Sequence, residues 1–248
     1  MKKQVKIILM VLSVLTMLVI WELVALRVDN PLILPGPGTV LVSLVEVVST
    51  GSFWMNAGST VFRGLIGFAL AMAVAFITGI PAGVSHNFRI FFTPFLVTIR
   101  SVPVITFILL ALIWFHPPQV PVFIALLTMY PIICGNLVTG IQETDRELVQ
   151  MARSYNMPFL SIIRHVYIPS TLPFLFSGIS TAMGFGWRAI IIGEVLSQPR
   201  YGIGTQMQLS QIYLLVKELI AWTVFAVLIS FLFDEIIRII ERKVIDWK

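Results

Sequence analysis

The chain has 248 residues, of which 58% are hydrophobic and 12% are charged, and its formal net charge is +5. Soluble domains carry about 25% charged residues, so this composition predicts an integral membrane protein. The basic residues stand in short stretches between apolar runs instead of along one polar face, which argues against nucleic-acid binding. The single cysteine, Cys134, excludes an intrachain disulfide and is expected to be a buried, inert thiol.

Six apolar segments are long enough to cross a membrane as helices, which takes roughly 20 residues for about 30 Å of hydrocarbon. They are residues 7–27, 59–84, 93–115, 120–141, 172–196 and 219–240. The first segment imitates a signal peptide but lacks a small-residue cleavage site, so we expect a retained anchor. The shorter apolar stretch 39–48 suits an interfacial helix better than a seventh span. The sequence therefore predicts an all-α integral membrane protein with six transmembrane helices in a single domain, 1–248.

The distribution of basic residues predicts the orientation, because short cytoplasmic loops collect Lys and Arg. With the N-terminus inside, the cytoplasmic side holds Lys2, Lys3, Lys6, Arg89, Arg146, Arg153, Arg164, Arg238, Arg242, Lys243 and Lys248. The opposite side holds Arg27, Arg63, Arg200 and Lys217. This asymmetry predicts that both termini are cytoplasmic. No internal repeat is evident, so the two-fold symmetry of a transporter would come from a second chain.

The longest cytoplasmic connection, residues 143–169, has the local pattern of two helices joined by a sharp turn. Four apolar residues recur at the spacing of one helix face: Leu148, Met151, Ala152 and Tyr155. Thr144, followed three residues later by Glu147, predicts a capping box at the start of the first helix. Asn156 is suited to the left-handed residue that ends a helix, and Pro158 to the first turn of the next.

This segment also carries a recognisable spacing. A cytoplasmic motif of Glu-Ala-Ala, three residues, Gly, nine residues and Ile-x-Leu-Pro corresponds here to Gln150-Met151-Ala152, Asn156 and Val166-Tyr167-Ile168-Pro169. Further agreement comes from Leu172-Pro173-Phe174, Gly202-Ile203-Gly204, Gly79-Ile80-Pro81-Ala82-Gly83 and Arg100-Ser101-Val102-Pro103. From about Leu34 to the C-terminus, the chain resembles permease subunits of binding-protein-dependent ABC importers, in the nitrate/taurine/sulfonate-type branch.

The resemblance implies that segment 143–169 docks into a cleft of a cytoplasmic ATPase and transmits its closure to the spans. The implied coupling residues are Glu147, Gln150, Met151, Ala152, Arg153, Tyr155, Asn156 and Pro169. Gln150 replaces the glutamate of the motif and removes a charge, for which Glu147 is a candidate substitute. The alternative is an amphipathic loop helix that lies on the membrane surface.

Three ionisable residues inside the expected spans are candidates for the translocation pathway, because burying a charge in a span costs at least about 2.5–3.5 kcal/mol. Arg100 is near the cytoplasmic end of its helix, and a structural, snorkelling role is the alternative for it. Arg188 lies near mid-depth of the fifth span, which the resemblance implies lines the pathway, and would favour an anionic substrate. Glu194 is about 240° around the helix from Arg188, so it either lines the pathway or pairs with another span.

The sequence has no Gly-x-x-x-x-Gly-Lys-Ser/Thr stretch, so ATP would be bound by a partner and this chain would be a non-catalytic subunit with no cofactor. Its three histidines are scattered and predict no metal site. The resemblance implies a bacterial inner-membrane importer with two permease copies, expected to be identical, two ATPases and an extracytoplasmic solute-binding protein. Small anions, sulfonates or vitamin precursors are the expected cargo.

Two other classes remain open. An ion-coupled secondary transporter would show an internal repeat and coupling carboxylates near mid-membrane, for which Glu194 is the only weak candidate. A membrane enzyme would cluster His, Asp or Ser at one interface, and the sequence shows no such cluster.

Overall fold

The computed structural model describes residues 2–245, so Met1 and residues 246–248, with Lys248 of the charge count, lie outside the described residues; the side chains of residues 2–4, 6 and 7 do as well. Every regular element within this range is helical, which confirms the all-α class. The helices are α1 (Lys2–Val28), α2 (Pro37–Val48), α3 (Gly51–Val84), α4 (His86–Ser101), α5 (Val104–Trp114), α6 (Val120–Gln142), α7 (Arg146–Ser154), α8 (Phe159–Ile162), the π-helical turn η1 (Ile163–Tyr167), α9 (Ile168–Ser197), α10 (Ile203–Ile212) and α11 (Val216–Val244).

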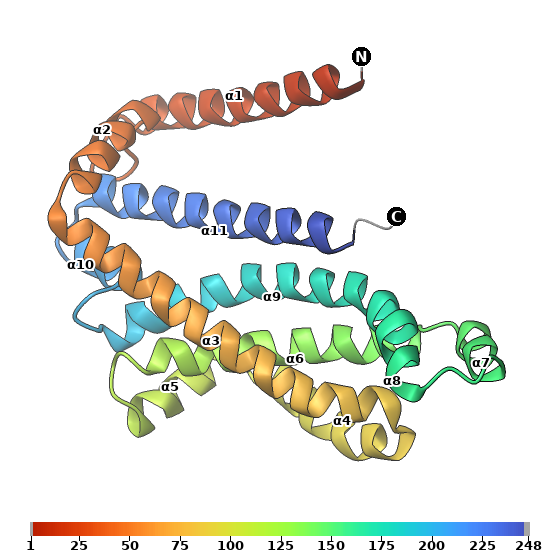
Figure 1. Ribbon diagram of the computed structural model, residues 1–248. Helices are drawn as coiled ribbons and strands as arrows, with labels where there is room; N and C mark the ends of the chain where they lie inside the picture. The colour runs from red at the N-terminus through yellow and green to blue at the C-terminus, as the bar shows by residue number, and fades with distance from the viewer. Residues whose placement is uncertain (1, 246–248) are drawn as a thin grey trace.

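The centre of the bundle is formed by α3, α6 and α9, with α11 beside α9 (Figure 1). Helix α6 packs against both of its neighbours, and its residues Met129, Ile133 and Cys134 are fully buried. At Gly67 of α3, a Cβ atom would lie 2.5 Å from the Cβ of Ala125 and 3.1 Å from a backbone oxygen of α6. Glycine therefore permits the close approach of these two helices, as small residues do at membrane helix interfaces.

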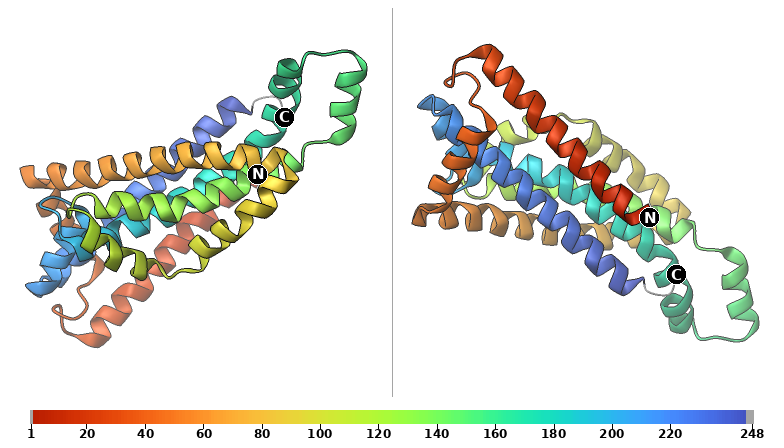
Figure 2. Two further views of the ribbon diagram at one scale, coloured as in Figure 1. Left: turned by 90° about the horizontal axis from the view of Figure 1, so that it is seen from below. Right: turned by 90° about the horizontal axis from the view of Figure 1, so that it is seen from above.

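The two ends of the bundle differ. Helices α2 and α10 gather at one end, whereas α7 projects from the other (Figures 1 and 2). Helix α2 has 12 residues and contacts α11, so it is too short to cross the hydrocarbon core. The structure therefore has a separate short helix where the sequence predicts an interfacial one.

Five helices are long and apolar enough to span a membrane, and the pair α4 and α5 brings the number to six if it is one broken span. The expectation of a single continuous helix over residues 93–115 is wrong, because α4 and α5 are bent by 91°. Pro103 cannot donate a backbone hydrogen bond, and it disfavours helical geometry at Val102, whose ψ is 128°.

The fifth span also differs from the expectation, because it begins inside the cytoplasmic segment. Helix α8, η1 and α9 form one helical stretch from Phe159 to Ser197. Pro169 has no N–H to donate to the carbonyl of His165, and the five-residue π turn lies at this point. The second helix of the predicted pair is thus the first part of the span.

Helix α1 stands clear of the bundle beyond its junction with α2 (Figures 1 and 2). Only 6% of its most apolar window is buried, although the helix is apolar on all sides. At its outer end, the Trp21 indole donates to the carbonyl of Pro35, 3.1 Å away. From Ile8 to Ile20, the described side chains of α1 are exposed.

Candidate functional site

Helix α7 begins at Asp145 and not at Thr144. The Asp145 carboxylate accepts a hydrogen bond from the backbone N–H of Glu147, 2.8 Å away, and so caps the helix. Thr144 is buried, and its hydroxyl lies 3.3 Å from the carbonyl of Gly140 at the end of α6. The capping box predicted from Thr144 is therefore wrong, because that hydroxyl bonds back into the preceding helix.

The end of α7 is a Schellman motif, and the prediction for Asn156 is confirmed. Asn156 has a φ of 55°, and its N–H donates to Arg153 while the N–H of Met157 donates to Ala152. Met157 packs against Ala152 and Ile162, which is the hydrophobic contact that accompanies this motif. Pro158 stands one residue before α8, at its N-cap. Local chemistry thus fixes the sharp reversal of the chain.

The four residues predicted to form one apolar face of α7 do not share one environment, because only one of them is buried. Ala152 is buried with Val149 against Ile162, while Met151 and Tyr155 point away with 54% and 78% of their surface exposed. Leu148 joins this outward apolar surface, and the polar candidates Glu147, Gln150 and Arg153 are exposed as well. The larger apolar residues therefore have no partner within the described part of the chain.

Pro169 is not part of the outward surface of α7. It lies at the start of α9, after η1, and is partly buried. It instead lies inside the helical stretch from Phe159 to Ser197, just after the π turn.

At the opposite end of the bundle, Glu194 of α9 is fully buried in a polar network. Its carboxylate pairs with Arg63 of α3, accepts from the Thr60 hydroxyl at 2.9 and 3.0 Å, and accepts from the N–H of Gly204 at 3.0 Å. Arg63 also donates to the carbonyl of Tyr201, 2.7 Å away. Of the two alternatives for Glu194, the geometry corresponds to pairing with another span.

The same network holds the start of α10. The N–H of Gly202 donates to Asn56 at 2.9 Å, and the N–H of Ile203 donates to Thr60 at 2.8 Å. These amides and that of Gly204 belong to the first turn of α10, where a helix has unpaired donors. Side chains of α3 and α9 thus satisfy three backbone donors of the segment between α9 and α11.

Close packing against α9 explains why residue 204 is a glycine. A Cβ atom at Gly204 would lie 2.7 Å from the Cβ of Glu194 and 3.0 Å from the backbone nitrogen of Val195, and it would also meet a backbone oxygen of α9. Helix backbone cannot move aside as a flexible side chain can. Glycine is therefore required where α10 crosses α9.

We expect Gly204→Ala to lower stability by about 1–3 kcal/mol, the usual cost of overpacking a core. Thermal unfolding of the purified chain, followed by the reactivity of the buried Cys134 thiol, would measure the loss. Gly58→Ala on α3 is the matched control, since a Cβ there meets nothing within 4 Å. Equal midpoints for the two variants would contradict the steric argument.

The three residues that α3 contributes to this network are not among the site residues predicted from the sequence. Asn56, Thr60 and Arg63 recur at i, i+4 and i+7, which places three polar residues on one face of an apolar helix. The charge count placed Arg63 on the extracytoplasmic side, and the structure shows that it is 11% exposed and paired. The signal that identifies it is a cation inside an apolar run, which requires a partner.

Arg100 also has a structural partner in the chain. Its guanidinium donates to the carbonyl of Pro131 in α6 at 2.6 Å. The guanidinium lies against Gly135, where a Cβ atom would collide with it. This contact ties the end of α4 to α6 one residue before the 91° bend begins. The structure thus places Arg100 at a helix junction, as the structural alternative predicts.

Arg188 has an exposed side chain and, among the described residues, neither an ion pair nor a hydrogen bond, whereas Glu194 is paired with Arg63 and Arg100 donates to Pro131. It lies 6.0 Å from the ring centroid of Phe185 and lines a groove of about 680 Å³ between α9 and α11. The neighbouring Trp187 is buried and donates to the carbonyl of Ala226 in α11, at 2.9 Å.

The sequence analysis predicts no metal site at the three scattered histidines, His86, His116 and His165. Among residues 2–245, His, Cys, Asp and Glu form no group of three or more that could hold a metal ion.

Five to six apolar helices are long enough to cross a membrane, so the fold is that of a multi-pass membrane protein. Residues 71–246 match the family model of the binding-protein-dependent transport system inner membrane component. This match covers more than half of the chain, so the chain belongs to that family and is a permease of an ABC importer.

Three similar proteins are also named as transport permeases. A Bacillus subtilis protein that is provisionally named an aliphatic sulfonates transport permease, SsuC, is 25% identical over 92% of this chain and 83% of its own length. The taurine transport system permease TauC of Escherichia coli is 23% identical over 92% and 84%, respectively. The bicarbonate transport system permease CmpB of Synechococcus elongatus is 24% identical over 79% and 70%.

Proposed function

We propose that this permease moves a small anionic solute into the cytoplasm and is driven by a separate ATPase that grips the outward surface of α7. The observation that carries the proposal is an exposed apolar surface outside the bundle, formed by Leu148, Met151 and Tyr155. Exposed apolar patches rimmed by polar residues mark protein interaction sites. Glu147, Gln150 and Arg153 supply such a rim.

The path from α7 to the bundle supports a coupling role. The Schellman turn at Asn156 connects α7 to α8, and from Phe159 the helix continues through η1 into α9. A movement of α7 would therefore reach the helix that carries Arg188 with only one turn in between. The reversal at Asn156 makes the same turn as the glycine of the family motif, so we infer that this substitution leaves coupling intact.

Gln150 and Glu147 are both exposed on α7. We infer that Glu147 supplies the charge that Gln150 lacks, because the two side chains lie three residues apart and so are neighbours on the helix surface. A basic residue of the ATPase would then pair with Glu147.

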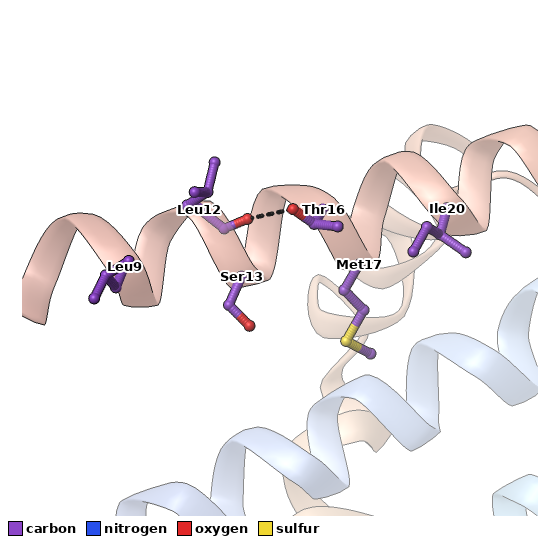
Figure 3. Close-up of a pocket in the computed structure, with 6 residues that line it drawn as sticks. All are labelled: Leu9, Leu12, Ser13, Thr16, Met17 and Ile20. Atoms are coloured by element: carbon purple, nitrogen blue, oxygen red, sulfur yellow. Dashed lines mark hydrogen bonds between the residues drawn. The ribbon is translucent and has the colours of Figure 1, made fainter.

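We infer that the transporter contains two copies of this permease, two ATPases that bind ATP, and an extracytoplasmic binding protein that delivers the solute to the α10 end. The exposed face of helix α1 supports the presence of a second permease copy. Residues between Leu9 and Ile20 along this face border an open apolar surface (Figure 3). On that surface the Thr16 hydroxyl donates to the Leu12 carbonyl at 2.8 Å, so this polar group is satisfied within the helix. The surface suits lipid or an apolar helix.

The orientation with both termini in the cytoplasm is consistent with the arrangement of the helices. The first turns of α1 and the last turns of α11 both point toward the end that carries α7 (Figure 2). An ATPase on α7 would then share its side of the membrane with both ends of the chain.

The alternative class, an ion-coupled secondary transporter, would use Glu194 as its coupling carboxylate, and the position of Glu194 argues against this role. Glu194 is fully buried and paired with Arg63, so it has no open route to a coupling ion in this conformation. Asp234, the carboxylate that lines the groove beside Arg188, is likewise paired, with Arg238 at 3.0 Å.

Transport by reconstituted proteoliposomes tests the proposal. We expect no uptake of a sulfonate such as taurine with this chain alone, and ATP-dependent uptake when the cognate ATPase and binding protein are added. Deletion of residues 150–156 would remove co-purification of the ATPase. Uptake by this chain alone, driven by an ion gradient, would refute the proposal.

A further inference from the structure

The groove between α9 and α11 holds a cation at mid-depth of the membrane. Trp187 bonds to Ala226, ten residues after the first residue of α11, so Arg188 lies about 15 Å along the helix from that end. The hydrocarbon core is about 30 Å thick, which places Arg188 near its middle. A cation at this depth normally pairs with another group or faces water.

The second charge of the groove is already neutralised. Asp234 of α11 accepts a hydrogen bond from Ser180 at 2.7 Å and pairs with Arg238 at 3.0 Å. Arg188 has neither a hydrogen bond nor an ion pair with any residue that the structure describes. The groove therefore offers one free positive charge.

The other walls are mostly apolar. Trp187 and Ile192 line the groove from α9, and Phe231 lines it from α11 with 70% of its surface exposed. Thr223 and Ser230 add hydroxyl groups from α11. A volume of about 680 Å³ is within the range of small-molecule sites and much larger than a small inorganic anion requires.

We propose that this groove binds an organic anion during transport, with the acidic group on Arg188 and the carbon skeleton against Ile192 and Phe231. This inference rests on the proposed function and narrows it to anions that carry an apolar part. A small hydrated anion such as bicarbonate would leave the apolar walls uncovered. The α11 wall then contributes to the choice of solute together with α9.

Thiol labelling tests this site in the full chain, without transport. Thr223→Cys places a thiol in the groove, and the native Cys134 is fully buried and so gives a low background. In membranes, we expect hexanesulfonate to slow the labelling of this thiol by a polar maleimide. Hexanol and bicarbonate, which lack either the charge or the apolar part, should have little effect.

Added to Thr223→Cys, Arg188→Gln should weaken the protection by hexanesulfonate about tenfold, because a hydrogen bond to a charged group is worth about 1.5–3 kcal/mol. Arg188→Lys should retain part of it. Val97→Cys on α4 is the control, since it is 53% exposed and does not line the groove. Unchanged masking of Cys134 would show that each variant is folded.

Three results would overturn the proposal: equal protection by hexanol, protection that survives Arg188→Gln, or an unreactive Thr223→Cys thiol, which would show that another helix covers the groove. The outcome is separable from the uptake experiment. Protection without ATP-dependent uptake would uphold the site and refute the proposed function, whereas uptake without protection would do the reverse.

Discussion

Replacing Glu194 with Ala is expected to destabilise the permease by about 3–5 kcal/mol, the usual cost of leaving one partner of a buried ion pair alone. Arg63 would keep a largely buried charge without its carboxylate partner, and the N–H of Gly204 would lose its acceptor. The midpoint of thermal unfolding, read from the reactivity of the buried Cys134, should fall by on the order of 10 °C.

The double variant Arg63→Ala with Glu194→Ala separates the charge effect from packing. We expect its cost to be smaller than the sum of the two single variants, because neither charge is then left uncompensated. Arg200→Ala is the control, since this cation lies in the same segment but is exposed. Additive losses in the double variant would show that the two side chains do not act as a pair.

Tyr155→Asp is expected to remove the ATPase from the permease. Tyr155 is 78% exposed in the outward surface of α7, so a charge there is tolerated by the fold but has to be desolvated when the ATPase docks. Central interface residues cost about 2 kcal/mol or more when lost, so the affinity should fall at least about tenfold. Co-purification of tagged permease with its ATPase would measure this.

Tyr213→Asp is the matched control for Tyr155→Asp. Tyr213 is 68% exposed, but it lies after α10 at the end of the bundle opposite to α7. The same chemical change should therefore leave the ATPase bound. An equal loss in both variants would indicate misfolding, and no loss in either would refute docking on α7.

Local signals in the sequence were sufficient for α7 and its turn. The Schellman motif depends on residues that are close in sequence, and Asn156 was identified because it tolerates a positive φ. The helix start was misplaced by one residue because Thr144 and Asp145 are both good caps. Only the packing of α6 decided that Thr144 bonds to Gly140.

The broken span shows the limit of hydropathy. Residues 93–115 are predominantly apolar with Arg100 as the one charge, so composition could not distinguish one helix from two. Pro103 was visible, but proline is tolerated within transmembrane helices, and α3, α6 and α9 each contain one. The bend of 91° is accompanied by contacts with α6, among them that of Arg100 with Pro131, which the sequence does not record.

By itself, the sequence determined the membrane class and most of the helical segments, because these depend on composition and periodicity, and its motif residues carried the resemblance to the family. Only the tertiary structure decided which residues of α7 face outward, that Glu194 pairs with Arg63, and that Arg188 faces a groove shared with α11. The physical reason is that pairing and exposure depend on helices far apart in sequence. Glu194 and Arg63 are separated by 131 positions, and no local pattern records which of the buried charges will meet.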